Sequence, residues 1–254
     1  MILTPLTGIP LVQPGDNIAE FIQDELRRLQ INLETGDVLV IAQKIVSKSE
    51  GRLVNLAQVT PSREAIDLAE RVQKDARFVE LVLRESQSVL RTRPGTLIVE
   101  HKLGFVCANA GIDHSNVQGI WGNPGDWVLL LPENPDLSAS LIRKELEKLN
   151  NNICLGVMII DSHGRAWRMG IVGATIGLSG VPGLVDLRGV PDLFGYQLRI
   201  TQVAAADELA AGASLLMGQA AERSPVVHVR GFPYPLREAS LRELIRPKNE
   251  DLFR

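Results

Sequence analysis

The amino-acid sequence predicts an α+β fold in which mixed sheets pack against helices. Two continuous apolar runs of strand length, residues 38–42 (VLVIA) and 157–160 (VMII), are typical of strands buried on both faces. Apolar residues also recur at helical spacing, as in Ile18, Ile22 and Leu26. Because strands and helices follow one another without a regular βαβ alternation, we expect neither a Rossmann nor a P-loop fold.

The length and composition limit the organisation and the partners. The 254 residues can bury a sizeable core and are expected to form a single unit, residues 1–254, built either as one domain or as two closely packed, interleaved lobes. The net charge is −3 and no run of Lys or Arg occurs, which argues against nucleic acid as the principal partner. There is no signal-peptide pattern and no apolar run near ~18 residues, so we expect a cytoplasmic chain without membrane association. Cys107 and Cys154 lie in apolar contexts and are predicted to be buried, without a disulfide or a zinc site.

The N-terminal part is predicted to contain an extended segment, a helix and a strand. Residues 3–12 hold two prolines and a glycine, which favours an extended edge or a loop. Asp16 is expected to cap a helix of about 14 residues. The strand 38–42 ends in a polar segment that contains Gln43, Lys44 and Lys48. The two lysines could belong to a solvated turn or could contact phosphate or carboxylate groups.

The next part is predicted to form a long helix and a hairpin. Thr60 and Pro61 are suited to begin a helix over residues 61–88, and a strand at 96–100 turns at 102–104 into the segment 105–122.

The segment 105–122 carries a group of polar side chains. A turn at Ala110 and Gly111 precedes Asp113 and Asn116, whose oxygen atoms are suitable ligands for a hard divalent cation. The alternative is that this group forms an Asx-turn that caps a helix. His114 is expected to be a turn residue or a supporting residue rather than a general base.

The third part is predicted to contain a strand over 127–131, a helix over 137–150 and the strand 157–160. Asp161 and Ser162 follow at the exit of that last strand, before an expected turn at His163 and Gly164. Asp161 could help to form the turn, or it could be a ligand held by the rigid strand.

The C-terminal part begins with five glycines within residues 170–183. They favour close packing of backbone on backbone, or a loop that approaches a ligand. A strand is expected at 196–201, a helix at 203–217 that stops at Gly218, a loop at 219–224, a strand at 225–229 and a helix at 238–245.

Six segments, in this order along the chain, resemble the gamma-glutamyl ligase family of deazaflavin coenzyme F420 biosynthesis. They are residues 6–12 (LTGIPLV), 37–51 (DVLVIAQKIVSKSEG), 108–116 (ANAGIDHSN), 155–164 (LGVMIIDSHG), 170–183 and 207–230 (DELAAGASLLMGQAAERSPVVHVR). The resemblance implies a GTP-dependent amide ligase that adds L-glutamate to the terminal carboxylate of coenzyme F420-0 through an acyl phosphate. It also implies two divalent cations, Mg or Mn, a potassium ion and an intertwined homodimer.

The resemblance assigns roles to individual residues. Asp113, Asp161, Ser162 and Gln219 correspond to the metal ligands, and Ser162 replaces the usual threonine while keeping the hydroxyl. Asp113, Asp161 and Lys48 are the predicted catalytic residues, since phosphoryl transfer mainly needs neutralisation of spreading negative charge. The predicted GTP contacts are Ile9, Pro10, Leu11, Val12, Gln43, Lys44, Lys48, Asn116, Met217, Gly218, Gln219, Ala220, Ala221, Glu222, Arg223 and Ser224.

Two alternatives remain at this stage. A related ligase could join an amino acid to another carboxylated cofactor with the same machinery. The second alternative is a protein that binds nucleotide and metal without turnover, although such a protein has less need for a pair of metal carboxylates.

Overall fold

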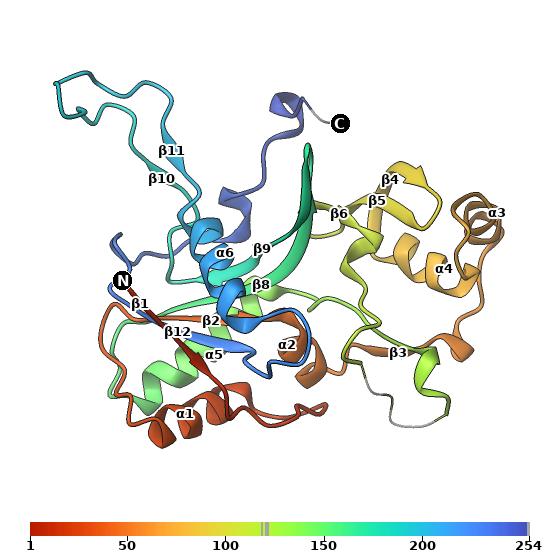
Figure 1. Cartoon of the computed structure of the whole chain (residues 1–254), viewed down its shortest axis with the longest axis horizontal. Coiled ribbons are helices and arrows are strands. Elements are labelled where there is room, and N and C mark those ends of the chain that lie inside the picture. The colour runs from red at the N-terminus through yellow and green to blue at the C-terminus, as the bar shows by residue number, and fades with distance from the viewer. Residues whose placement is uncertain (118, 120–121, 253–254) are drawn as a thin grey trace.

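The computed structural model describes residues 1–117, 119 and 122–252, and it confirms the α+β class. Its centre is a five-stranded sheet (Figure 1). The strands β2 and β8 are parallel neighbours, whereas the other neighbouring pairs are antiparallel, so the sheet is mixed. The strand order is β1 (Ile2–Leu6), β12 (Val226–Arg230), β2 (Val38–Ala42), β8 (Gly156–Arg165) and β9 (Arg168–Ser179).

Helices cover both faces of this sheet. They are α1 (Ile18–Arg28) and α5 (Pro135–Leu149) on one face and α6 (Ala205–Met217) on the other. Leu39 and Ile41 of β2 belong to the hydrophobic cluster of the first face, whereas Val38 and Val40 belong to the cluster of the second. The continuous apolar run thus forms a strand that is buried on both faces, as predicted.

A second group of elements lies beside the sheet and encloses a hydrophobic cluster of its own (Figure 1). The two-lobe interpretation stays a prediction. The group comprises α3 (Arg63–Val72), α4 (Ala76–Arg84), β4 (Ser86–Arg93), β5 (Thr96–His101) and β6 (Val106–Ala108), together with the antiparallel pair β3 (Leu53–Asn55) and β7 (Trp127–Leu129).

The prediction of one helix over residues 61–88 is wrong. The chain forms α3 and α4 there, and the strand β4 begins at Ser86. Gln73 ends α3 in the left-handed conformation, with φ of 53°. The side chain of Asp75 then accepts a hydrogen bond from the backbone N of Arg77 and caps α4. These local signals override the apolar spacing that continues across the break.

The polar segment after β2 is also different from a solvated turn. It forms the helix α2 (Gln43–Ser49) directly at the end of the strand, because Ile45 and Val46 give it a buried side. Another small correction concerns α1, which is capped by the side chain of Asn17 rather than by Asp16.

The turn expected at His163 and Gly164 is absent, because β8 continues to Arg165. Asp161 and Ser162 therefore lie inside the strand, and the interpretation of Asp161 as a turn-former is wrong. The strand that pairs with β8 is formed by the glycine-rich segment, which is β9 and not a loop. A Cβ atom on Gly173 would lie 2.5 Å from the backbone oxygen of Ala210 in α6, so the glycines permit the close backbone packing that the sequence favours.

Two C-terminal predictions are wrong in element type. Residues 196–201 are part of a long hairpin between β10 (Val185–Asp186) and β11 (Gln202–Val203), which projects from the body of the molecule (Figure 1). The segment 238–245 contains only a short 3-10 helix. Short 3-10 helices lie at Leu56–Gln58, Asn109–Gly111, Pro124–Asp126, Leu241–Glu243 and Lys248–Glu250.

The two cysteines differ from each other. Cys107 is buried as predicted, but Cys154 is exposed. Within the described residues, none of the helices has the length and apolar character needed to cross a membrane.

Candidate functional site

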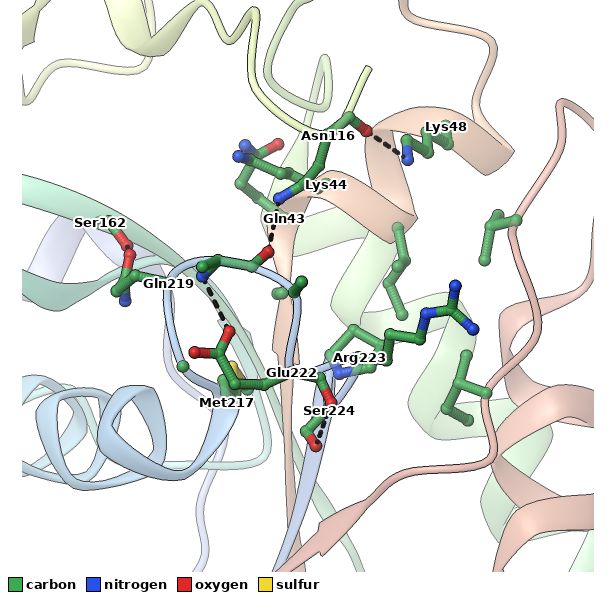
Figure 2. A pocket seen from close by; sticks show the side chains of 18 of the residues that line it. Gln43, Lys44, Lys48, Asn116, Ser162, Met217, Gln219, Glu222, Arg223 and Ser224 are labelled. Carbon is green, nitrogen blue, oxygen red and sulfur yellow. Dashed lines mark hydrogen bonds between the residues drawn. The ribbon is translucent and has the colours of Figure 1, made fainter. Parts of the chain in front are cut away.

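A cavity of about 580 Å³ lies where β2 ends beside the middle of β8 (Figure 2). Because these two strands are parallel neighbours and Ala42 pairs with Ile160, the segment that follows β2 lies beside Asp161 and Ser162 of β8. The loop before α1, the start of α2, Asn116, the middle of β8 and the loop after α6 form the walls of this main cavity. The segments are far apart in the sequence, so only the folded sheet brings them together.

Every residue that the sequence assigns to GTP binding lines the main cavity. This is a statement about position, and their role in nucleotide binding stays a prediction. The residues are Ile9, Pro10, Leu11, Val12, Gln43, Lys44, Lys48, Asn116, Met217, Gly218, Gln219, Ala220, Ala221, Glu222, Arg223 and Ser224.

Two lysines of α2 form a cationic side of the main cavity. Lys44 and Lys48 are one helical turn apart, so both project from the same face of α2. The Nζ atom of Lys44 donates to the Oγ atom of Ser115 at 2.8 Å, and the Nζ atom of Lys48 donates to the backbone oxygen of Asn116 at 2.8 Å. Burial, together with the charge of Lys44, lowers the pKa of Lys48. The two ammonium groups repel each other, and a negatively charged ligand between them would offset this repulsion.

Asp113 lies beside Lys44, within electrostatic range of Asp161. The Oδ2 atom of Asp113 accepts a hydrogen bond from Nε2 of Gln43 at 2.7 Å, and its Oδ1 atom lies 3.4 Å from Nζ of Lys44. Burial raises the pKa of Asp113 to about 6; the charge of Lys44 acts in the opposite direction, and the charge of Asp161 raises the pKa further. The two carboxylates are thus close enough to interact electrostatically. Asp161 lines the main cavity. Asp113 is not among the lining residues, but its carboxylate contacts Gln43 and Lys44, which are.

The Asx-turn interpretation of Asp113 is wrong, because its side chain bonds to α2 instead of capping a helix. The residue after it, His114, stacks on Phe78 with ring centroids 5.1 Å apart, which agrees with the expected supporting role.

The oxygen atoms around the acidic pair suit a hard cation. No group of three or more His, Cys, Asp and Glu side chains is arranged to hold a metal within the part of the chain that the structure describes. The Oγ atom of Ser162 lies 2.8 Å from Oε1 of Gln219, however, and this hydroxyl and amide belong to residues that line the main cavity together with Asp161 (Figure 2). Mg²⁺ commonly takes one or two carboxylates and completes its shell with water and substrate phosphates. The donor set therefore fits Mg²⁺ or Mn²⁺ that is shared with a phosphorylated ligand.

The loop after α6 is held in shape by its own hydrogen bonds. Gly218 has a φ of 72° and ends the helix, as predicted. The backbone N of Ala220 donates to Oε2 of Glu222 at 2.8 Å, and Nδ2 of Asn116 donates to the backbone oxygen of Ala220 at 3.0 Å (Figure 2). Glu222 thus stabilises the loop from within, and Asn116 links the loop to the lysine side of the main cavity.

Sequence reasoning missed several lining residues and one supporting contact. Ser47 donates from Oγ to Oε1 of Gln43 at 2.9 Å, and both side chains are buried. The spacing of four residues between Gln43 and Ser47 is a signal for this contact only once the segment is known to be helical. The lining residues that were missed are Ala42, Ile45, Val117, Ile160, Ser214 and Pro225.

Comparison with known proteins identifies the family. The model of the family described as F420-0:Gamma-glutamyl ligase matches residues 8–231. The chain is 44% identical over 249 residues to the coenzyme F420:L-glutamate ligase of Methanocaldococcus jannaschii, covering 97% of this chain and 94% of that protein. It is 46% identical over 247 residues to the enzyme of the same name from Methanopyrus kandleri, with 96% and 93% covered. For the enzyme of that name from Archaeoglobus fulgidus, the identity is 42% over 250 residues, with 98% and 95% covered. The chain therefore belongs to the F420-0:gamma-glutamyl ligase family.

Proposed function

We propose that this protein adds L-glutamate to the terminal carboxylate of coenzyme F420-0, using GTP and an acyl-phosphate intermediate. Membership of the family makes it an enzyme that forms C–N bonds. One observation carries the finer proposal. The main cavity combines two lysines on one helix with a neighbouring pair of carboxylates, which is the arrangement of charges needed around phosphates.

The proposed reaction has two steps. A carboxylate oxygen of F420-0 first attacks the γ-phosphorus of GTP, the bond to the β,γ-bridging oxygen breaks, and GDP leaves. The nitrogen of L-glutamate then attacks the acyl carbon, the C–N bond forms, phosphate leaves and the nitrogen loses a proton. Such phosphoryl transfer depends mostly on positioning and charge neutralisation rather than on covalent chemistry by the protein. Lys44 and Lys48 hold the phosphates in this account, and the loop after α6 fixes the nucleotide against β8.

Asp113, Asp161, Ser162 and Gln219 would hold two divalent cations, Mg or Mn. When bound, these ions neutralise charge on the phosphate oxygens. Gln43 holds the carboxylate of Asp113 in place through its 2.7 Å hydrogen bond. The potassium ion remains a proposal from the family resemblance, since we assign no residue to it.

A homodimer is part of the proposal. The hairpin between β10 and β11 carries two large apolar side chains, Leu193 and Phe194, that are 96% and 95% exposed. Met169, near the tip of the β8–β9 hairpin, is 96% exposed as well. Large apolar side chains that are almost fully exposed on hairpins are typical of contact surfaces. We assign them to contact with a second copy of this chain, in agreement with the intertwined dimer that the resemblance implies.

The test is an assay of the purified protein with F420-0, L-glutamate, GTP and Mn²⁺, in which phosphate release and product mass are measured together. We expect one phosphate for each glutamyl group added, and no release without L-glutamate. Replacing GTP by ATP in a parallel reaction checks the nucleotide. Binding of GTP without phosphate release would favour the alternative of a protein that binds nucleotide and metal but catalyses no reaction. Turnover with a different carboxylated cofactor, and none with F420-0, would favour the related ligase.

A further inference from the structure

A second cavity, of about 310 Å³, lies beside the outer edge of the sheet. It is bounded by the turn between β5 and β6, the β8–β9 hairpin, the first turn of α6 and the C-terminal segment 241–251, and we call it the tail cavity. The residues that line it are Gly104, Phe105, Val106, His163, Ala174, Thr175, Asp207, Leu241, Leu244, Ile245, Arg246 and Asp251. None of them is used by the site described above.

The walls of the tail cavity contain buried polar atoms without a hydrogen-bond partner. Such atoms occur on three side chains in the described part of the structure, and two of these, His163 Nε2 and Thr175 Oγ1, belong to residues that line the tail cavity. Thr175 is only 5% exposed. Because Nε2 of His163 lies 3.1 Å from Oδ2 of Asp161, the lining atom that has no polar partner among the described residues is Oγ1 of Thr175. Since buried polar groups are nearly always paired, this hydroxyl points to a place where a ligand supplies the missing partner.

Three charged side chains line the tail cavity, Asp207, Arg246 and Asp251, and within the described residues Asp207 and Arg246 do not pair with each other. Asp207 uses Oδ1 to accept a hydrogen bond from the backbone N of Thr175 at 2.9 Å, and its Oδ2 accepts none from the described residues. Arg246, on the C-terminal segment, forms neither a hydrogen bond nor an ion pair with any residue that the structure describes. A small molecule that carries both an ammonium and a carboxylate group can pair with both side chains at once.

The tail cavity reaches the main cavity through β8. His163 and Asp161 are two residues apart on that strand, so their side chains project from the same face. The Nε2 atom of His163 lies 3.1 Å from Oδ2 of Asp161, although the geometry does not form a hydrogen bond. A residue that lines the tail cavity, His163, is thus in contact with a residue that lines the main cavity, Asp161.

We propose that the tail cavity binds the amino-acid co-substrate, L-glutamate. Arg246 pairs with a carboxylate of the amino acid, Asp207 and Thr175 receive its amino end, and Phe105 and Leu244 cover its hydrocarbon part. This inference rests on the proposed function, because the ligase reaction requires an amino acid as a substrate. The inference states where that amino acid binds.

The test compares Arg246→Ala and Asp207→Asn with the wild type in steady-state assays in which L-glutamate, GTP and F420-0 are varied one at a time. Both variants are expected to raise the KM for L-glutamate by about tenfold or more, the scale of losing one charge-assisted hydrogen bond. The KM for GTP should stay unchanged. Arg242→Ala is the matched control, because Arg242 is an exposed arginine of the same segment that does not line the tail cavity. Circular dichroism and thermal unfolding check that each variant is folded.

The outcomes separate this inference from the proposed function. If the wild type ligates L-glutamate and both folded variants keep its KM, the tail cavity is not the amino-acid site. If the wild type shows no turnover that depends on L-glutamate, the proposed function fails. Calorimetric titration with L-glutamate alone then decides the inference: binding that Arg246→Ala abolishes would support it, and no binding would overturn it.

Discussion

Asp113 is the single residue on which the proposed chemistry depends most. Its carboxylate is held by Gln43, lies 3.4 Å from Lys44 and interacts electrostatically with Asp161. Asp113→Asn keeps the shape of the side chain and an oxygen that can accept from Gln43, but removes the charge. We expect a loss of ligase kcat of about a hundredfold to a thousandfold, the range found when one preorganised electrostatic group is removed.

The control for that variant is Asp67→Asn, which changes an exposed carboxylate on α3. Both proteins should unfold at the same temperature as the wild type. Full ligase activity in a folded Asp113→Asn protein would remove Asp113 from the metal site.

Ser47 is expected to affect the site indirectly. It donates to Oε1 of Gln43, which leaves the amide nitrogen of Gln43 facing Asp113. In Ser47→Ala the amide can rotate, so we expect a several-fold rise in the Mn²⁺ concentration needed for half-maximal activity, with activity recovered at saturating Mn²⁺. Ser49→Ala, on the same helix, is the control, because its hydroxyl bonds only to the backbone of α2. An identical Mn²⁺ dependence in both variants would show that Gln43 is positioned without Ser47.

At the scale of elements, the packing of β9 on α6 depends on glycine. A Cβ atom on Gly173 would lie 2.5 Å from the backbone oxygen of Ala210 and 2.6 Å from Cβ of Ser214. Gly173→Ala must push β9 away from α6, which we expect to lower the free energy of unfolding by ~1–3 kcal/mol. Gly164→Ala in the same hairpin is the control, since nothing lies within 4 Å of the added Cβ. Urea unfolding of the two variants should differ clearly, and equal midpoints would contradict the close packing.

The sequence predicts the elements whose signals are local. The run 38–42 and the Ala-rich helix that ends at Gly218 are recognisable because their apolar patterns extend over the whole element. The break at Gln73 was missed because one residue in the left-handed conformation leaves no trace in the apolar spacing. The extension of β8 through Asp161 was missed because the polar residues there resemble a turn, and only pairing with β9 makes them a strand.

The candidate site could be predicted only in part from local patterns. From spacing alone, Asp113 could also belong to an Asx-turn and Asp161 could also help to form a turn. Only the family resemblance assigned both residues to one metal site. Their proximity depends on the parallel pairing of β2 with β8, elements more than a hundred residues apart in the chain. The tail cavity could not be predicted at all, because its walls come from four segments whose residues have no common motif.

At the scale of the whole molecule, acidic pH should weaken the contacts that link the start of β2 to β12 and so lower the free energy of unfolding. Asp37 is 2% exposed, and burial alone would raise the pKa of its carboxyl. Hydrogen bonds from His228 (2.9 Å) and Arg230 (2.7 Å) outweigh burial and hold the pKa well below the usual range. This depressed pKa contributes stability that is fully present above the unfolded-state value near ~3.9 and is lost as the pH falls below it.

Asp37→Asn should therefore destabilise the protein at pH 7 by ~1.5–3 kcal/mol, because it removes the charge that the buried ring of His228 and the partly exposed guanidinium of Arg230 bond to. Its unfolding free energy should also vary less with pH below ~4 than that of the wild type. Denaturant unfolding at pH 7 and at acidic pH measures both effects. Parallel stability curves for the two proteins would contradict the assigned role of Asp37.

The proposed dimer is also a property of the whole molecule. Changing Leu193 and Phe194 together to Asp should convert the protein to a monomer, because charge cannot be buried in an apolar contact without a partner. Light scattering coupled to size-exclusion chromatography measures the mass. Arg199→Asp on the same hairpin controls for added negative charge. A wild type that is monomeric at all concentrations would refute the dimer.

The most direct test of the central claim is anomalous diffraction at the manganese edge from crystals grown with Mn²⁺ and a non-hydrolysable GTP analogue. The account predicts manganese peaks between the carboxylates of Asp113 and Asp161, with the phosphates of the nucleotide facing Lys44 and Lys48 in the main cavity. Manganese bound elsewhere, or a nucleotide outside that cavity, would contradict it.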